Sequence, residues 1–574
     1  MSSLYANLKR RVDSVVNPSI LSLESFASPI LPTSSGGRGS LRPKFQYSRP
    51  VFLQLWTSDE LRASADHNVR PIIVPRDIDV LPFQTGYAEC VNSGKSEWNE
   101  DQAGFCRKVL SHPSEPFTEL PYTYFGIFDG HAGVGAALAA ANQFHHILHE
   151  KLVDIIEMLL PDSDNIPTEK KSMIFQYPLS FQKTVTKEEL IIGALESAFA
   201  EMDAMLAEDR TKYRNAGGCT ALVTLFIGGK MYVSNAGDSR AVLCQRKDGV
   251  AFPTPFSFDH TPDTERERLM TTGKLNPALM ANDYVAMEYT KRPSKRDLGQ
   301  RTLYKEGSMK GWAYKTLTPN DLKMPLVTGN GKRSRLLGTI GVTRGFGDHD
   351  LRALGSGILI KPFLSCHPEV ISRDLTTVVS IPDENNEDGD YGVLIMATDG
   401  LWDVADPEAV SNTVFKTLDK YPTEKHRYTM VAQELVAKSR GRVNSSGHWR
   451  LADVEAAATV DDISVICIPV YQYYKQWVEW EKENQEKKRK HEEELQNRTE
   501  SMSSVEIALD DTDEVALSDS LKETNLEETP DEKTTKENED IPERTEEDTK
   551  EDTKPAKKKG KGKKGSSSSS SSTC

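Results

Sequence analysis

Residues 124–133 read YFGIFDGHAG, an apolar run that ends in a carboxylate, a glycine and a histidine, with an alanine-rich segment after it. This order predicts a buried strand, a tight turn and the start of a helix. The turn offers the carboxylate of Asp129 as a hard-cation ligand, the carbonyl of Gly130 at close approach, and the titratable imidazole of His131. Taken alone, the stretch has a plainer interpretation, a helix-capping Asp beside a surface His.

Other carboxylates lie beside expected strands in separate parts of the chain: Asp101, Asp399 and Asp461. Strand ends converge in space, and clustered carboxylates repel one another unless cations neutralise them. Carboxylate and carbonyl oxygens suit Mg²⁺ or Mn²⁺, and the absence of Cys/His clusters argues against zinc. Two such ions about 4 Å apart would create a nucleophilic hydroxide and clamp a phosphoryl group.

The net charge of the 574-residue chain is −15, but it is unevenly spread. Residues 499–554 contain 21 acidic and 6 basic side chains, a net of −15 from that segment alone. The folded part therefore gives no reason to expect nucleic acid as a partner. Seven scattered cysteines without a C-x-x-C pair, and no secretory signal, indicate a reducing, cytoplasmic compartment. The longest apolar runs are too short to cross a bilayer.

Composition divides the chain into three regions: 1–70, 71–470 and 471–574. Residues 1–16 have a cationic amphipathic helical pattern, which predicts peripheral contact with intracellular membranes, and a helix docked on the body is the alternative. Residues 19–70, rich in Ser, Pro and Gly, are typical of a linker with little core of its own. The last region predicts a charged, solvated helix followed by a disordered acidic, lysine- and serine-rich tail, whose lysine cluster is either a nuclear signal or a solubilising segment.

Within residues 71–470, β-like runs and amphipathic helices follow one another. We expect helices at about 133–160, 187–208, 405–418 and 426–439, and strands at 220–227, 230–235, 241–244, 393–398 and 463–470. The turn at 237–240, GDSR, carries Asp238. Residues 262–337 form a long irregular insertion with basic and aromatic side chains, which favours an ordered, ligand-binding segment over a mobile surface loop.

Six motifs occur in the order found in one enzyme family: FDGHAG (128–133), GCTA (218–221), GDSR (237–240), RGFGD (344–348), DGLWD (399–403) and DDISV (461–465). With them the chain resembles the metal-dependent protein serine/threonine phosphatases of the protein phosphatase 2C type, over roughly residues 86–470. The resemblance implies an α+β fold, a central sandwich of two antiparallel β-sheets flanked by pairs of α-helices. The insertion at 262–337 corresponds to an enlarged flap beside the active site.

The resemblance also implies the chemistry, hydrolysis of phosphoserine or phosphothreonine by a water or hydroxide activated at two Mg²⁺ or Mn²⁺ ions. Glu100 would hold a metal-bound water, and His131 would be the general acid that protonates the leaving alkoxide. A purely structural hydrogen bond is the alternative role of His131. At the matching positions the metal ligands would be Asp129 as the bridge, the Gly130 carbonyl, Asp101, Asp399 and Asp461, with Asp238 and Asp403 joining Asp399 at a weaker third ion.

Two positions depart from the family pattern. Four residues before Glu100, where relatives often have an arginine that binds the substrate phosphate, this chain has Ser96. Lys95 is the nearest cation and would substitute as a point charge without a bidentate grip. Asp462 stands where relatives often have Asn, and we expect it to cap a turn.

GKS before NEDQ (residues 94–102), TIGVTR (339–344) and the long insertion resemble most the protein phosphatase 1H, 1J and 1M branch. That branch includes an enzyme acting on phosphorylated Rab GTPases, so a phosphoprotein, and specifically a Rab GTPase, is the expected partner. A catalytically weak or inactive scaffold of the same fold and a hydrolase of small phosphoesters are the alternatives. A cysteine-dependent phosphatase is excluded, because no Cys is followed by Arg six positions later.

Overall fold

The computed structural model describes residues 43–490 apart from 113–114, 161–184, 211, 214–216, 248, 379–391 and 453–455, together with residues 493 and 497. The expected helix at 1–16, the acidic segment and the lysine cluster lie outside the described residues, and so do the membrane and nuclear interpretations that depend on them. Among the described residues, no helix is long and apolar enough to span a membrane.

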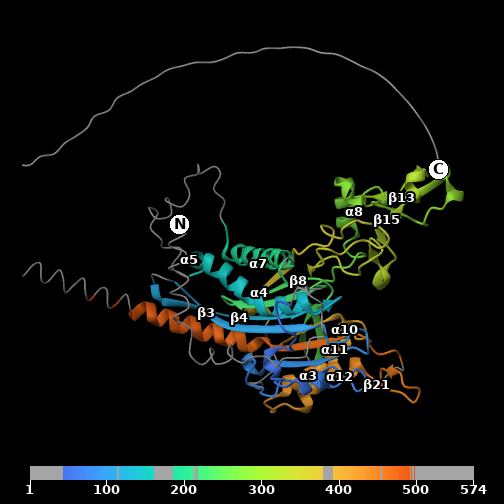
Figure 1. The fold of residues 1–574 in the computed structure, drawn as a ribbon. Coiled ribbons are helices and arrows are strands. Elements are labelled where there is room, and N and C mark those ends of the chain that lie inside the picture. Colours follow the sequence, from blue (N-terminus) through green and yellow to red (C-terminus); the bar gives the residue numbers. More distant parts are fainter. Residues whose placement is uncertain are drawn as a thin grey trace, which may run out of the picture. The chain divides into compact units, whose positions relative to one another are not determined.

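Two antiparallel sheets form the body of the protein (Figure 1). In the described residues one sheet has the strand order β1-β2-β23-β20-β9-β10 and the other the order β19-β8-β7-β4-β3. The first comprises β1 (Ile72–Ile73), β2 (Gly86–Cys90), β23 (Ile463–Pro469), β20 (Val393–Ala397), β9 (Arg240–Lys247) and β10 (Val250–Pro255). The second comprises β19 (Glu369–Asp374), β8 (Lys230–Ala236), β7 (Ala221–Ile227), β4 (Glu115–Phe128) and β3 (Gln102–His112).

Successive side chains along a strand point to opposite faces of the sheet, so they pack either between the two sheets or against the outer helices. Phe125 and Ile127 of one sheet share a buried cluster with Met396 and Ile466 of the other, so this cluster lies between the sheets. On the opposite face of β4, Tyr124 packs with the helices α4 (Gly135–Asp154) and α7 (Lys187–Asp209). The other sheet is covered by α11 (Pro407–Lys420) and α12 (Arg427–Arg440).

The expected α+β class with antiparallel sheets is confirmed, and the expected strands and helices recur with ends shifted by a few residues. The helix expected at 133–160 is divided at Ile155 into α4 and the short α5 (Ile156–Leu159). The expected and observed ends agree because glycine, aspartate and proline, which favour turns, bound the apolar runs at nearly every turn.

The insertion is folded and encloses a hydrophobic cluster of its own. That cluster also includes Ala353, Ile360 and Phe363, so the folded insertion extends beyond the expected end at residue 337. We keep the name flap for residues 262–337. Its elements are α8 (Arg266–Leu275), β11 (Tyr284–Val285), β12 (Met287–Tyr289), β13 (Arg301–Glu306), β14 (Ala313–Thr316), β15 (Met324–Pro325), β16 (Val327–Thr328), β17 (Arg335–Leu336) and the short 3-10 turns between them.

Both flanks of the expected domain also belong to the folded body. Residues 43–70, expected to be linker, contribute Phe52 and Leu53 to the cluster between the sheets and form α3 (Ser58–Ser64). The boundary expected at residue 71 is therefore too late, because a few apolar anchors are enough to dock a Pro- and Ser-rich segment. At the other end, a helix over 470–490 is solvated only in part: Tyr473 is buried and stacks on Phe226 with ring centroids 3.9 Å apart.

Candidate metal centre and active site

The loops at one end of the sheets carry the expected metal ligands. Asp101 directly precedes β3 and Asp129 directly follows β4, and their neighbours Gln102 and Phe128 are paired in the ladder. This pairing brings the two carboxylates to adjacent positions although 27 residues of hairpin separate them in the chain. Asp129 is held further through its backbone, since its carbonyl accepts a 2.9 Å hydrogen bond from the N–H of Thr220.

The other sheet delivers the remaining ligands to the same end. Asp399 follows β20 and Asp461 precedes β23, and the paired residues Ala397 and Val465 fix these two strand ends side by side. Asp238 lies in the turn between β8 and β9, where the chain passes from one sheet to the other. Carboxylates from both sheets therefore converge, as the positions of the expected strands predict.

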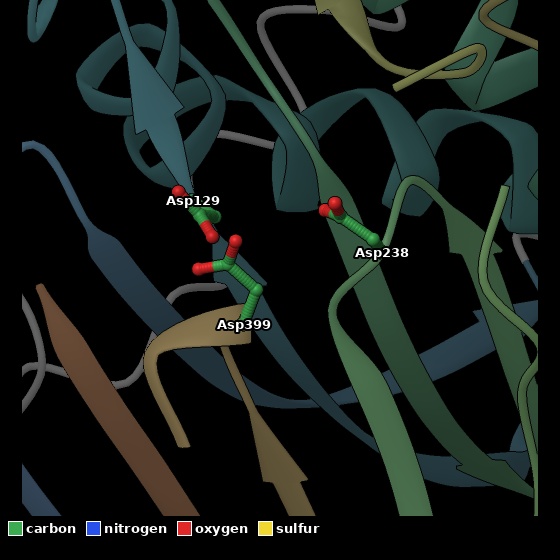
Figure 2. A group of neighbouring side chains, drawn as sticks. All are labelled: Asp129, Asp238 and Asp399. Atoms are coloured by element: carbon green, nitrogen blue, oxygen red, sulfur yellow. The ribbon is translucent and has the colours of Figure 1, made fainter. Parts of the chain in front are cut away.

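Asp129, Asp238 and Asp399 present oxygen atoms that all lie within 4.8 Å of one another. Figure 2 shows the carboxylates of Asp129 and Asp399 facing each other, with Asp238 approaching from a neighbouring loop. Burial raises the pKa of Asp129 and of Asp399 well above its usual range, and the neighbouring carboxylates raise both further. Burial, followed by the charge of Asp259, raises the pKa of Asp238 to about 6. Mutual repulsion of this kind is relieved by a bound cation.

Asp101 gives independent support for a cation at this place. The residue is 1% exposed, and its Oδ2 accepts a 2.9 Å hydrogen bond from the hydroxyl of Thr398. Its Oδ1 is buried without a hydrogen-bond partner among the described residues. A buried carboxylate oxygen without a donor is costly, and a hard cation would satisfy it. The donor set consists of carboxylate and carbonyl oxygens, which fits Mg²⁺ or Mn²⁺.

Gly130 is required by the close approach of two loops. A Cβ atom at this position would lie 2.4 Å from the carbonyl oxygen of Glu100, which no larger residue could accommodate without moving the backbone. The glycine thus lets the Asp129 turn pack directly against the loop that carries Glu100 and Asp101.

His131 has a partner that the sequence did not reveal. Its Nε2 lies 2.7 Å from Oδ2 of Asp348, which is 217 residues further along the chain. Gly218 makes room for the pair, since a Cβ there would lie 2.3 Å from that oxygen and 2.8 Å from Nε2. Burial lowers the pKa of His131, but the hydrogen bond and charge of Asp348 outweigh burial and raise it above its usual value. Asp348 ends the RGFGD motif, which is the signal that could have suggested a role.

The loop before Glu100 presents Lys95 and not Ser96 to the centre. The hydroxyl of Ser96 donates to the carbonyl of Trp98 at 2.7 Å and accepts from the amide of Asn92 at 2.9 Å, so it is engaged within its own loop. The ammonium of Lys95 forms an ion pair with Asp461. Burial lowers the pKa of Lys95, but the charge of Asp461 outweighs burial and raises it above its usual value.

Glu100 and Asp462 connect the loops of the centre. Oε1 of Glu100 accepts a 2.7 Å hydrogen bond from the N–H of Gly133, and burial raises the pKa of this carboxyl above its usual value. Asp462 accepts from the backbone N–H of Asn92 at 2.7 Å and from that of Glu100 at 3.0 Å. Its carboxylate therefore fastens two loops, in agreement with the expected capping role.

A cavity of about 580 Å³ opens above the carboxylates and is walled in part by the flap. Two of its cations are neutralised, because Arg240 binds Asp259 through two hydrogen bonds and Lys332 lies 2.9 Å from Asp403. Arg335 of β17 also lines the cavity, and its guanidinium donates only to backbone carbonyls among the described residues. No sequence pattern distinguishes Arg335 from the other basic residues of the flap.

Comparison with known proteins agrees with this geometry. The family model described as protein phosphatase 2C matches residues 170–271 and 326–445. Protein phosphatase 1H of Danio rerio is 38% identical over 516 residues, which cover 78% of this chain and 96% of that protein. Protein phosphatase 1H of Homo sapiens is 39% identical and covers 78% of this chain and 97% of its own. Protein phosphatase 1J of Mus musculus is 42% identical over 451 residues, 74% of this chain and 86% of that protein. These similarities confirm the resemblance drawn from the motifs: the chain belongs to the protein phosphatase 2C family of metal-dependent serine/threonine phosphatases.

Proposed function

We propose that this protein hydrolyses phosphoserine and phosphothreonine in proteins at a centre of two Mg²⁺ or Mn²⁺ ions. The observation that carries the proposal is the convergence of acidic strand ends from both sheets on one point at the floor of the cavity. Asp129 would be shared between the ions, with the Gly130 carbonyl, Asp101, Asp399 and Asp461 around them. The neighbouring carboxylates of Asp238 and Asp403 would serve a third, weaker ion.

The side chains around the metals have separable tasks. When bound, the divalent cations supply positive charge to the phosphoryl oxygens and lower the pKa of the attacking water. Glu100 would orient that water through Oε2, since Oε1 accepts the N–H of Gly133. His131 would donate its proton to the departing alkoxide oxygen, because Asp348 raises the pKa of the imidazole and so favours its protonated form. The aspartate also fixes which ring nitrogen is engaged, which leaves the other nitrogen to face the substrate.

Recognition of the phosphate would fall to Lys95 and Arg335. Lys95 pairs with Asp461, and a metal on Asp461 would free its ammonium for the phosphate. Arg335 has a guanidinium without a carboxylate partner among the described residues and lines the cavity from the flap side. A planar guanidinium binds phosphate through two hydrogen bonds, which a lysine cannot do.

A catalytically inactive scaffold is the second candidate. Such a protein would be expected to have lost metal-binding carboxylates, whereas all of the positions expected from the family motifs carry aspartate here. Activity of the purified full chain separates these candidates.

Removal of the metal or of its bridging ligand is expected to abolish activity. Chelation should stop hydrolysis of a phosphothreonine peptide, and Mn²⁺ or Mg²⁺ should restore it. Asp129→Asn should lower kcat by at least about 100-fold, since even partners outside the coordination shell contribute 10–100-fold. The control is Asp419→Asn, which removes a charge paired with Arg246 on the surface. Full activity of Asp129→Asn would refute the two-metal centre, and an inactive wild-type chain with all metals supplied would favour the scaffold.

Asp348→Asn is expected to impair only reactions that need a general acid. Asparagine tolerates the positive φ of 54° at this position, so the backbone should be retained. We expect kcat on a phosphothreonine peptide to fall about 100-fold and kcat on p-nitrophenyl phosphate to change little, because nitrophenolate leaves without protonation. Because Asp348 raises the pKa of His131, its loss should lower that pKa and move the alkaline decline of kcat to lower pH. Asp350→Asn, an exposed neighbour paired with Arg210, is the control. Equal losses on both substrates would contradict the acid role.

The flap has the composition and exposure of a protein-docking surface. Its aromatic residues differ in exposure: Tyr284 is buried, Tyr289 and Tyr304 are half-buried, and Trp312 and Tyr314 are 45% and 61% exposed. The hydroxyl of Tyr289 donates to Asp321. Arg301 lies over the Tyr314 ring at 5.0 Å. Further exposed cations on the flap are Lys291, Arg292, Lys295 and Arg296.

Exposed aromatic and arginine side chains are typical anchors of protein interfaces. Metal-and-water chemistry selects poorly among phosphorylated side chains, so discrimination must come from surfaces beside the site. We infer that the flap docks a folded phosphoprotein, and we propose a Rab GTPase phosphorylated in its switch region as the substrate. The proposal of a Rab rests on the resemblance to the branch named above.

The variant Trp312→Ala/Tyr314→Ala tests this role of the flap. Both side chains are exposed and lie outside the hydrophobic cluster of the flap, so its fold should be retained. We expect kcat/KM on the phosphorylated Rab to fall about 30-fold, the size of one interface hot spot, and kcat/KM on p-nitrophenyl phosphate to be unchanged. Val443→Ala, an exposed apolar residue of β21 (Arg442–Val443), is the matched control. Proportional losses on both substrates would show that the flap supports the centre and selects nothing, and no wild-type activity on the Rab would exclude that substrate.

A further inference from the structure

Residues 45–53, which precede all described strands, contact the loop that carries Glu100 and Asp101; we call them the N-terminal strap. The ring of Tyr47 packs on Trp98 with centroids 4.9 Å apart, and its hydroxyl donates to the carbonyl of Asn99 at 3.3 Å. The amide of Gln102 donates to the carbonyl of Ser48 at 3.0 Å. Contacts on both sides of the ligand loop come from a segment whose composition predicted a linker.

Arg49 is the centre of these contacts. The residue is 4% exposed, and its Nη1 donates to the carbonyls of Asn99 and Asp101 at 3.1 and 2.6 Å. One arm of the guanidinium therefore holds the carbonyls on either side of Glu100. The other two donors, Nε and Nη2, each bind a carboxylate oxygen of Glu89 at 2.7 Å.

The buried ion pair of Arg49 and Glu89 is stabilised by further hydrogen bonds. Glu89 is 1% exposed and accepts a further 2.7 Å hydrogen bond from the hydroxyl of Tyr87. Burial lowers the pKa of Arg49, but the charge of Glu89 outweighs burial and raises it above its usual value. A lysine could not replace the arginine. Its single ammonium lacks the planar fork of the guanidinium, so it cannot bind the carboxylate and both carbonyls at once.

The ligand loop is fixed from both sides by these bonds. The strap holds two of its carbonyls, and Asp462 accepts the N–H of Glu100 from the other side. Oδ1 of Asp101 is buried without a hydrogen-bond partner in the described part of the chain, so the direction of this side chain matters for any cation. That direction depends on the conformation of the backbone at residues 99–101, which Arg49 holds through its hydrogen bonds to the carbonyls of Asn99 and Asp101.

We propose that Arg49 is a positioning residue of the metal centre, and that the N-terminal strap completes the site by holding the backbone of the Glu100–Asp101 loop. This inference rests on the metal centre proposed above. It assigns a function in metal binding to a segment that precedes the family motifs, and it implies that the affinity for the cation depends on the docking of the strap.

The test measures Mn²⁺ binding to the full chain by calorimetry, with thermal unfolding in EDTA as a separate measure of the fold. The double variant Arg49→Met/Glu89→Met removes both buried charges together, because removing one alone would leave the other unpaired. We expect its unfolding midpoint in EDTA to stay close to that of the wild type and its Mn²⁺ affinity to fall 10–100-fold, as for other groups that orient metal ligands. At saturating Mn²⁺ its kcat should recover, which a damaged core would not allow.

Two further variants complete the comparison. Arg49→Lys keeps a positive charge opposite Glu89 but lacks the fork, so it should also bind Mn²⁺ more weakly. Arg76→Met removes an exposed arginine from the same end of the chain, paired with the half-buried Glu60, and it should bind Mn²⁺ like the wild type. Wild-type affinity in the double variant or in Arg49→Lys would overturn the role of the strap. A wild-type chain that binds no Mn²⁺ would instead overturn the metal centre.

A measurement on the wild type covers the case in which the variants unfold. Coupling between two sites is reciprocal, so a strap that strengthens metal binding must itself be stabilised by the metal. Addition of Mn²⁺ should therefore slow amide hydrogen exchange within residues 45–53. It should also slow exchange within residues 99–101, because the metal stabilises the docked strap and the ligand loop together. Unchanged exchange in the strap, with slower exchange in the ligand loop, would overturn the proposal.

Discussion

Repulsion among clustered carboxylates, buried at Asp101 and half-buried at Asp129 and Asp399, dominates the end of the sheets where the strand loops meet. Asp101, Asp129 and Asp399 all have a pKa raised first by burial and then by neighbouring carboxylates, so the native arrangement is costly without cations. The fold supports this arrangement with strand pairing, glycine turns and buried hydrogen bonds. Positive charge comes from the edges of the site: Lys95 from the ligand loop and Lys332 from the flap each pair with one of its aspartates.

Much of the site could be predicted because its signals are local. Each ligand stands where an apolar run meets a turn, and Asp129 and Asp399 are both followed by glycine. Strand ends are clear when a run of buried residues stops at a charged one, and the motif order then identified the family. The metal dependence followed from the type of ligand, since the set contains oxygen donors and no thiol.

The groups that orient the ligands could not be predicted, because their partners are distant in sequence. Asp348 meets His131 across 217 residues, and Arg49 meets Glu89 across 40 residues. No periodic pattern marks either contact. Ser, Pro and Gly around Arg49 are typical of a linker. The two apolar residues that anchor the strap, Phe52 and Leu53, are too few to predict a docked segment from the sequence. Arg335 was hidden for another reason: basic residues are common along the flap, and sequence alone does not show which one lines the cavity.

The central claim is that the acidic strand ends form one centre for two divalent cations. Anomalous diffraction from crystals of the full chain grown with Mn²⁺ tests it most directly, because manganese is located independently of any assumed ligand. We expect two strong anomalous peaks on either side of the Asp129 carboxylate, one of them within coordination distance of Asp101 Oδ1, with the Lys95 ammonium displaced from Asp461. A structure without manganese at Asp129, or with the ion pair of Lys95 and Asp461 intact in saturating Mn²⁺, would contradict it.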